Sequence, residues 1–225
     1  MKLLVAAATE AEIGIFMQYL QLQALPTGPM QYLTKQQNSV QACITGVGMV
    51  ATAYNLTKAL QKSNYDMVLQ VGVGGAFDRT LELGNVYFIT SEQCGDLGAE
   101  DHYNFIDVFD LGLEQANVYP FSGKKLLTPD APLHAKIDLP RVSGLTINAV
   151  SGTEFTIKRR EEMYGCQVES MEGAAFHYVC LQEKVPFAQV RSISNYVEPR
   201  DKSKWQMKDA IIALNKWLID FLETV

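Results

Sequence analysis

Short apolar runs alternate with amphipathic stretches along much of the chain, which predicts strands alternating with helices. The first apolar run is KLLVAAA, and a helical pattern follows from about Glu10 to Leu22. A second strand is predicted over VQACITG, and a helix over Val50 to Gln61. Two further strands are predicted over DMVLQVGVGG and NVYFITSE. Such a sequence of elements is typical of an α/β sheet covered by helices.

The pattern weakens between Gly95 and about Leu139, where glycine and acidic residues interrupt the apolar runs. Loops with one short helix over the sheet are expected there, as a candidate lid or interface. The alternation then returns: strand LTINAVSG, a helix near Thr156 to Tyr164, strand CQVES, helix MEGAAFHYVCLQEK, strand FAQVRSIS and a helix from Lys204 to Leu222. With 225 residues and no repeat or linker, the chain is expected to form one domain over residues 1–225.

Composition excludes several classes of protein. The net charge is -6, and no basic run is longer than a pair such as Lys124-Lys125, so nucleic acid is not an expected partner. The apolar run at the start is too short to span a bilayer, so we expect a cytoplasmic protein without a membrane partner. The four cysteines lie far apart and lack a CxxC pair, so neither a metal site nor a disulfide framework is expected.

Two glycine clusters follow predicted strands. TGVGMVA fits a dinucleotide fingerprint, with Asp66 twenty residues beyond Gly46. However, Asp66 begins the next predicted strand, whereas a ribose-binding acid belongs at that strand's carboxyl end, so no nicotinamide cofactor is expected. The second cluster is VGVGGAF. Glycine turns at two strand ends would let the backbone approach a flat ligand or a sugar, although tight turns alone remain an alternative.

VESMEGAAF and RSISN, near the end of the chain, carry the strongest chemical signal. Glu172 lies among small apolar residues, and a buried carboxylate there must be paired or must bind a ligand hydroxyl. Asn195 follows the last predicted strand, and ligands of open α/β sheets collect at such carboxyl ends. A site for a polar, sugar-like molecule is predicted. Glu12 opens the first helix, where a solvated first turn is the simpler interpretation.

Six motifs in order, MKLLVAAATEAEI, TGVGMVA, VGVGGAF, VSGTEF, VESMEGAAF and VRSISN, resemble the purine nucleoside phosphorylase and nucleosidase superfamily over nearly the whole chain. Within it, TEAEI resembles the methylthioadenosine/S-adenosylhomocysteine nucleosidases. DLGAED, VESMEGAAF and SNYVEPRD resemble the futalosine hydrolases of menaquinone biosynthesis. The resemblance implies a three-layer αβα sandwich with a twisted mixed β-sheet, in a homodimer or larger homo-oligomer.

The resemblance also implies roles for individual residues. Glu12 would activate the attacking water, and Glu172 with Met171 would hold the ribose. A carboxylate bound to sugar hydroxyls strengthens its interaction as the ribose gains oxocarbenium character. Phe155 would stack on the base. Backbone near the ribose and purine would come from Val47, Gly48, Met49, Val73 and Gly74.

Asn195 departs from the methylthioadenosine nucleosidases, which have an aspartate there to protonate adenine. An amide cannot deliver a proton, but it can donate to N7 or O6 of a 6-oxopurine and accept from a ring N–H. We therefore expect hydrolysis of futalosine to hypoxanthine and dehypoxanthinylfutalosine, without a cofactor. Arg200 or Arg79 would bind its benzoate. The alternatives are a methylthioadenosine or aminodeoxyfutalosine nucleosidase, a phosphorylase, or a nucleoside-binding protein without turnover.

Overall fold

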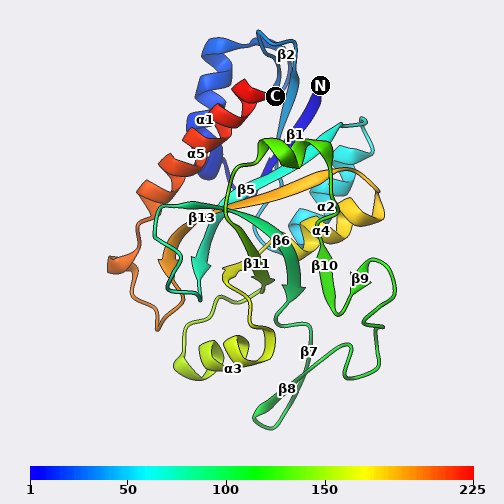
Figure 1. Ribbon diagram of the computed structural model, residues 1–225, viewed down its shortest axis with the longest axis vertical. Helices are drawn as coiled ribbons and strands as arrows, with labels where there is room; N and C mark the ends of the chain where they lie inside the picture. Colours follow the sequence, from blue (N-terminus) through cyan, green and yellow to red (C-terminus); the bar gives the residue numbers. More distant parts are fainter.

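A twisted mixed sheet of eleven strands forms the centre of the protein, whose computed structural model describes residues 1–225 (Figure 1). Ten of the strands lie in the order β2-β3-β4-β1-β5-β12-β11-β6-β10-β9. The eleventh, β13, pairs with both β5 and β6. The strands are β1 Lys2–Ala7, β2 Leu25–Gly28, β3 Gln31–Leu33, β4 Ser39–Ile44, β5 Met67–Ala76, β6 Val86–Cys94, β9 Phe121–Ser122, β10 Lys125–Leu127, β11 Arg141–Thr146, β12 Val168–Ser170 and β13 Phe187–Tyr196.

Five strands of this sheet close into a ring. Strand β13 runs parallel to β5 and antiparallel to β6, β6 runs parallel to β11, and β12 joins β11 back to β5. Strand β1 lies outside the ring and pairs in parallel with β5. The carboxyl ends of β1, β5 and β13 therefore lie at the same edge of the sheet, where ligand sites of α/β proteins form.

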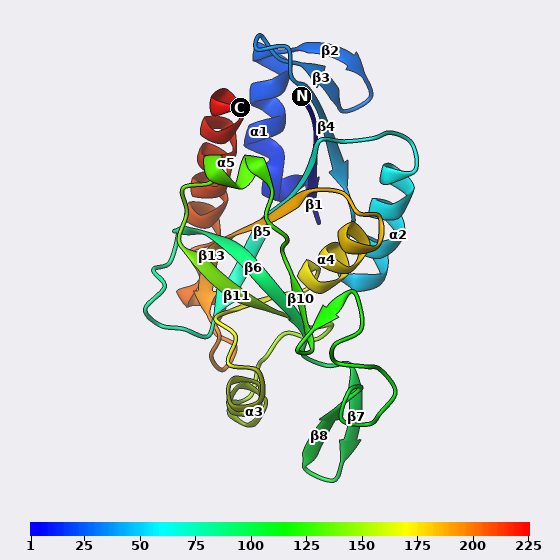
Figure 2. The same ribbon diagram turned by 45° about the vertical axis from the view of Figure 1, so that its right-hand side comes forward.

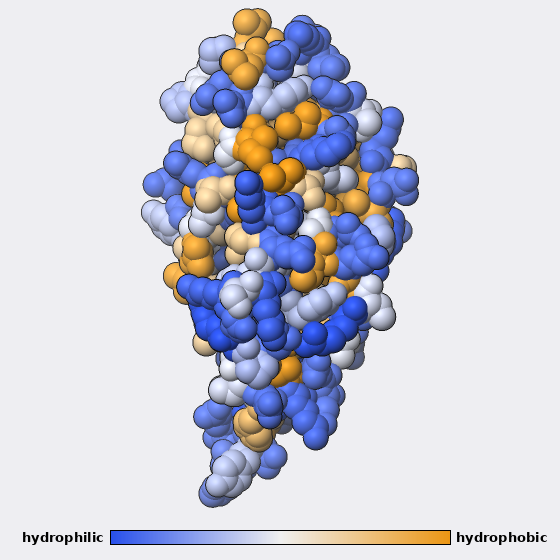
Figure 3. Space-filling model, turned by 90° about the vertical axis from the view of Figure 1, so that its left-hand side faces the viewer, coloured by the Kyte–Doolittle hydropathy of each residue, from blue (hydrophilic) through white to orange (hydrophobic).

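Helices cover both faces of the sheet and complete three layers, as expected. Helices α1 (Glu10–Gln23) and α5 (Met207–Thr224) pack together on one face, and α2 (Met49–Leu60) and α4 (Gly173–Gln182) on the other (Figure 1). Their apolar stripes fill two cores. Phe16 and Leu218 belong to the first, and Leu56 and Phe176 to the second. The outer face of α1 and α5 is largely hydrophilic, with a limited apolar group in its upper half (Figure 3).

The predicted helices all form, with ends that differ by up to about three residues, but several short strands were not predicted. The stretch between Gly95 and Leu139 contains two hairpins, β7 (Gly98–Asp101) with β8 (Asn104–Asp107), and β9 with β10. The expected short helix is the 3-10 turn η1 (Pro132–Lys136). The β7–β8 arm projects away from the body, below α3 (Glu154–Tyr164) (Figure 2).

The glycines of VGVGGAF do not form the predicted turn. They lie inside β5, where the absence of a side chain allows close packing. A Cβ at Gly72 would collide with the Arg191 guanidinium, and one at Gly74 would lie 2.9 Å from Val168 Cγ1. The first cluster is a true turn, because Gly46 and Gly48 have φ of 82° and 89°.

The cysteines, the helix lengths and Asp66 bear on the disulfide, membrane and cofactor expectations. All four cysteines are free, and no group of three or more His, Cys, Asp or Glu side chains could hold a metal ion. No helix combines the length and apolar character needed to cross a membrane. Asp66 lies at the amino end of β5, as predicted, where its carboxylate accepts from the Lys2 N–H.

Candidate active site

A cavity of about 740 Å³ lies at the carboxyl end of the central strands. Of the residues predicted from the sequence, it is lined by Glu12, Val47, Val73, Gly74, Met171, Glu172, Asn195 and Arg200. It also receives Trp205, Met207 and Ile211, from the segment before α5 and its first turns. Segments distant in the sequence thus converge on one pocket of a size suited to a nucleoside with a bulky substituent.

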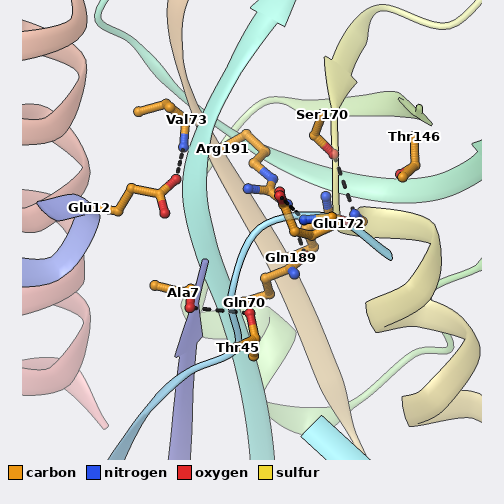
Figure 4. A network of polar contacts seen from close by, with 12 residues as sticks. Ala7, Glu12, Thr45, Gln70, Val73, Thr146, Ser170, Glu172, Gln189 and Arg191 are labelled. Carbon is orange, nitrogen blue, oxygen red and sulfur yellow. Dashed lines mark hydrogen bonds and ion pairs between the residues drawn. The ribbon is translucent and has the colours of Figure 1, made fainter. Parts of the chain in front are cut away.

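Glu12 lies in the first turn of α1 and points inward (Figure 4). Its Oε2 accepts hydrogen bonds from the N–H and hydroxyl of Thr9, at 3.0 and 3.1 Å, and its Oε1 accepts from the Val73 N–H at 3.1 Å. Asn215 of α5 donates to the Glu12 carbonyl at 2.8 Å and so ties the first turn of α1 to α5. The interpretation as a solvated first turn is wrong, because Glu12 is buried.

Glu172 is the residue that precedes α4, and it is buried at the cavity wall. Its Oε1 accepts from the Gly48 N–H at 3.1 Å, so the glycine turn at Gly46 and Gly48 binds the carboxylate directly. Its Oε2 lies 3.5 Å from Arg191 Nη2 (Figure 4). Both oxygens keep acceptor capacity for ligand hydroxyls.

Arg191 is a buried residue that the sequence interpretation missed. It extends from β13 across Gly72, is 1% exposed, and donates to Gln70 Oε1 at 3.1 Å. The position a Cβ would take on Gly72 is 2.8 Å from Glu12 Oε1, so the guanidinium lies between Glu12 and Glu172. The arginine offsets the mutual repulsion of two buried carboxylates. An arginine inside a strand that is predicted to be buried was the signal that could have revealed it.

Asn195 lies where the β13–β5 ladder shifts register, between Ile193 and Asn195. Its Oδ1 accepts from the Ser194 hydroxyl at 2.8 Å, and its Nδ2 donates to the Tyr196 carbonyl at 2.9 Å. These two bonds fix which end of the amide is the donor. The second N–H of Nδ2 has no partner among the protein atoms and is left for a ligand acceptor.

The loop from Asn148 to Ser151 lines the same cavity and is held by three charged side chains, of which Arg160 and Glu169 are buried. Asp96 accepts from the Asn148 N–H at 2.6 Å. Arg160 of α3 donates to the Ser151 hydroxyl at 2.7 Å and lies 3.4 Å from Glu169, which also accepts from the Ser151 N–H. Burial raises the pKa of Glu169, against the lowering effect of the Ser151 bonds and Arg160. None of these contacts was predicted.

The other predicted residues lie outside the cavity lining. Gly48 and Met49 begin α2. Phe155 lies in the first turn of α3, is 56% exposed, and has the Arg159 guanidinium 5.5 Å from its ring centre. Its role in stacking on the base stays a prediction.

The two candidate arginines differ in their partners. Arg79 pairs with Glu198 at 2.9 Å and lies over the Tyr196 ring, outside the lining. Hydrogen bonds from Arg79 and then Lys204 lower the pKa of Glu198. Arg200 lines the cavity and lies over Trp205, 5.5 Å from the ring centre, without a carboxylate within ion-pair distance.

The geometry supports a specific kind of chemistry. Glu12 can accept a proton from a water in the cavity, because a carboxylate within hydrogen-bond reach acts as a general base. Glu172 can bind sugar hydroxyls and stabilise positive charge that develops on the ring. Asn195 can hold a heteroaromatic edge. The cavity combines the groups needed to cleave a bond between a sugar and a base.

Comparison with known proteins gives a consistent result. A sequence model described as the phosphorylase superfamily matches residues 2–223. The futalosine hydrolase of Streptomyces coelicolor is 32% identical over 161 residues, which cover 69% of this chain and 65% of that protein. The futalosine hydrolase of Thermus thermophilus is 30% identical over 171 residues, or 76% of this chain and 75% of that protein.

Solved structures share the fold over the whole chain. The futalosine hydrolase of Helicobacter pylori superposes with a TM-score of 0.81 at 16% identity, over 100% of this chain and 98% of that one. A methylthioadenosine/S-adenosylhomocysteine nucleosidase of Colwellia psychrerythraea, in complex with adenine, has a TM-score of 0.79 at 21% identity, over 99% and 95% of the two chains.

Proposed function

The chain belongs to the phosphorylase superfamily, and from this premise we propose that it hydrolyses futalosine to hypoxanthine and dehypoxanthinylfutalosine, a step of menaquinone biosynthesis. The observation that carries the proposal is Asn195 on the cavity wall, an amide in the same lining as the two carboxylates Glu12 and Glu172. Two relatives named futalosine hydrolase, at 32% and 30% identity, support the same substrate.

Hydrolysis proceeds from the groups already described. The ribose hydroxyls bind Glu172, with Met171 beside the sugar, and the negative charge of Glu172 stabilises the oxocarbenium-like transition state. Glu12 takes a proton from the water that attacks the anomeric carbon. Arg191, between these carboxylates, offsets their mutual repulsion and limits the cost of burying both.

The purine is selected at the other end of the cavity. The free N–H of Asn195 donates to N7 or O6 of hypoxanthine, and Phe155 stacks on the ring. Adenine presents an amino group instead of O6, so a donor faces a donor and polar groups are left unpaired. Hypoxanthine leaves more readily as an anion than adenine, so an amide is sufficient here. Backbone at Val47, Val73 and Gly74 bounds the sugar.

Arg200 is the group that we assign to the benzoate of futalosine. It is the one cation in the cavity lining without a carboxylate partner, whereas Arg79 is occupied by Glu198. Guanidinium and carboxylate form bidentate, charge-assisted hydrogen bonds. The ring of Trp205, beside Arg200, offers an apolar surface for the aromatic part.

We also propose a cytoplasmic homodimer or larger homo-oligomer. Val47, Val50 and Tyr54, at the start of α2 next to the cavity, are 56%, 84% and 64% exposed, an apolar surface that a second copy would cover. Four free cysteines suit a reducing compartment. Sedimentation analysis tests the oligomer.

The test of the activity is chromatography of the bases released from futalosine, aminodeoxyfutalosine, inosine and methylthioadenosine in phosphate-free buffer. Hypoxanthine from futalosine is the expected result. Adenine from methylthioadenosine would contradict the assignment of Asn195. Release that requires added phosphate would make the protein a phosphorylase.

A further inference from the structure

Two fully buried polar atoms, Gln189 Oε1 and His177 Nε2, have no hydrogen-bond partner. Their side chains come from β13 and α4, behind the wall of the cavity. Buried polar atoms are normally paired. The side chain of Gln189 borders the His177 imidazole and raises its pKa, against the larger lowering effect of burial. Because the two side chains are neighbours, one rearrangement can satisfy both atoms.

The surroundings of Nδ1 determine which ring nitrogen of His177 carries the hydrogen. Nδ1 lies 3.2 Å from the Leu126 carbonyl oxygen. A carbonyl only accepts, so Nδ1 carries the hydrogen. Burial lowers the pKa of His177 to about 3, so the ring is neutral and Nε2 is an acceptor. Nε2 therefore needs a donor, and the Gln189 amide is its neighbour.

The Gln189 amide meets Glu92 on its other side. In the orientation that the structure shows, Gln189 Nε2 donates to Glu92 Oε1 at 2.8 Å. A half-turn of the amide exchanges its oxygen and nitrogen without changing its shape. The NH2 group then donates to His177, and the carbonyl oxygen faces Glu92. Two oxygens at this separation form a hydrogen bond only if one carries a proton, and that proton must be on Glu92.

The surroundings of Glu92 suit a neutral acid. It lies on β6, is 1% exposed, and has no cation within ion-pair distance. Its Oε2 accepts from the Thr146 hydroxyl at 2.9 Å. Gly144 and Gly173 leave the space that its carboxyl occupies, because a Cβ on either would collide with Oε1. Burial raises the pKa of Glu92 to about 7 even though a hydrogen bond from Gln189 Nε2 lowers it. A half-turn of the amide removes that lowering effect and so favours the neutral form further.

We propose that Glu92 is held as a neutral carboxylic acid and is a positioning residue for Glu172. Its proton completes a directed chain of hydrogen bonds that leaves the first turn of α4 and returns to that helix. In order, the donors and acceptors are Ala174 N–H to Thr146 Oγ1, Thr146 O–H to Glu92, Glu92 O–H to Gln189 Oε1, Gln189 N–H to His177 Nε2, and His177 Nδ1–H to the Leu126 carbonyl.

This chain of hydrogen bonds holds the start of α4 in place, and Glu172, on which the proposed reaction depends, comes directly before that helix. Glu172 immediately precedes α4, Gly173 rests against the Glu92 carboxyl, and the Ala174 N–H is the first donor of the chain, at 2.7 Å from Thr146 Oγ1. The hydrogen-bond assignment stands without the proposed function, whereas its effect on turnover rests on that function.

The charges around Glu92 favour the same state. Arg191 and Glu172 are the charged groups whose fields reach it, with opposite effects. The thiols of Cys94 and Cys166 also face it, and burial raises their pKa to about 12 and about 11, so both are neutral. Ionised Glu92 would be a further buried carboxylate competing for the one guanidinium of Arg191.

Nitrogen-15 NMR of the histidines tests the chain in the unmodified protein, which has three histidines. His134 is an internal control, because its Nε2 lies 2.7 Å from the Phe187 carbonyl and must carry the hydrogen. We expect the opposite tautomer for His177, with a hydrogen-bonded, unprotonated Nε2. A proton on His177 Nε2 would overturn the proposal, because Gln189 Oε1 would then be its acceptor and Glu92 a carboxylate.

Infrared spectroscopy tests the acid itself. Wild type should show a protonated-carboxyl stretch below neutral pH that fades at or above pH 7 and is absent from Glu92→Gln. Glu169→Gln is the matched control, since Glu169 lies 3.4 Å from the Arg160 guanidinium and the band should remain. A wild type without the band, or a band that survives in Glu92→Gln, contradicts a neutral Glu92.

Kinetics separates positioning from a merely structural role. The amide of Glu92→Gln can donate to Gln189 at every pH, so the several-fold decline of kcat that we expect in wild type above pH 7 should be absent from the variant. An unchanged decline would remove the positioning role. If wild type does not hydrolyse futalosine, the proposed function fails, while the two spectroscopic tests still decide the state of Glu92.

Discussion

Arg191 Nη2 lies 3.5 Å from Glu172 Oε2 within the ring of strands, and both side chains are almost completely buried. The guanidinium reaches this place only because β5 has a glycine, Gly72, where any side chain would obstruct it. An arginine from β13, a carboxylate before α4 and a glycine of β5 are thus interdependent. Replacement of Arg191 or Glu172 leaves the other charge buried without its partner, and replacement of Gly72 fills the space that the guanidinium occupies.

Arg191→Met should destabilise the protein strongly. Removal of one partner of a buried ion pair costs about 3 to 5 kcal/mol, because the remaining charge stays buried. The double variant Arg191→Met/Glu172→Gln should recover part of this loss in the free energy of unfolding, measured by urea denaturation. Equal stability of the single and double variants would show that the two side chains are not energetically coupled.

Glu12→Gln should lower kcat by about 10² to 10⁴, the usual contribution of a general base. The amide keeps the size of the side chain but has one acceptor oxygen, so it can keep the Thr9 bonds or the Val73 bond and not both. Ligand binding should therefore change less than kcat. Single-turnover kinetics with futalosine, alongside calorimetric binding of a non-hydrolysable analogue, separates the two effects. Full activity in this variant would remove Glu12 from the chemical step.

The sequence predicted the main layers and the meeting of Glu172 with Asn195, because apolar periodicity and strand ends are local signals. It did not predict Arg191, since the partners of a buried arginine come from distant segments, nor the glycines of β5, whose function is to make room rather than to turn. The arm β7–β8 was missed because its four-residue strands, GAED and NFID, carry little apolar alternation. The hydrogen bond from Arg160 to the Ser151 hydroxyl was likewise not predicted, because it depends on tertiary contacts alone.

Asn195→Asp should shift the preference from 6-oxopurine to adenine nucleosides. An aspartate can receive a proton to deliver to N7 and can accept from the adenine amino group, whereas toward hypoxanthine it faces O6 as an acceptor against an acceptor. A site with mismatched polar groups discriminates by up to about 10⁴. The ratio of kcat/KM for futalosine to that for aminodeoxyfutalosine is the measurement. A ratio that does not fall would show that Asn195 does not read the base.

Arg200→Gln should raise KM for futalosine and leave inosine, which lacks the benzoate, unaffected. Loss of a charge-assisted hydrogen bond costs about 1.5 to 3 kcal/mol, or roughly 10- to 100-fold in kcat/KM. Arg79→Gln is the matched control, because Arg79 is already paired with Glu198 at 2.9 Å and lies outside the cavity lining. A larger effect from Arg79→Gln than from Arg200→Gln would reverse the assignment.

Glu92 should make the free energy of unfolding depend on pH, and the variant Glu92→Gln isolates its contribution. Burial raises its pKa from 4.5 to about 7, so between these values the folded chain holds a proton that the unfolded chain has released. The contribution of Glu92 to the free energy of unfolding is complete below pH 4.5 and falls by about 3 kcal/mol as pH rises to about 7.

His177 has the opposite sign, since burial lowers its pKa from 6.5 to about 3 and its contribution grows with pH over that range. The wild-type profile alone therefore mixes both groups. Subtraction of the Glu92→Gln profile cancels His177, because the variant keeps that imidazole. The difference in free energy of unfolding, wild type minus variant, should fall by about 3 kcal/mol between pH 4.5 and pH 7. A difference that rises with pH would mean that folding favours the carboxylate of Glu92 over its acid.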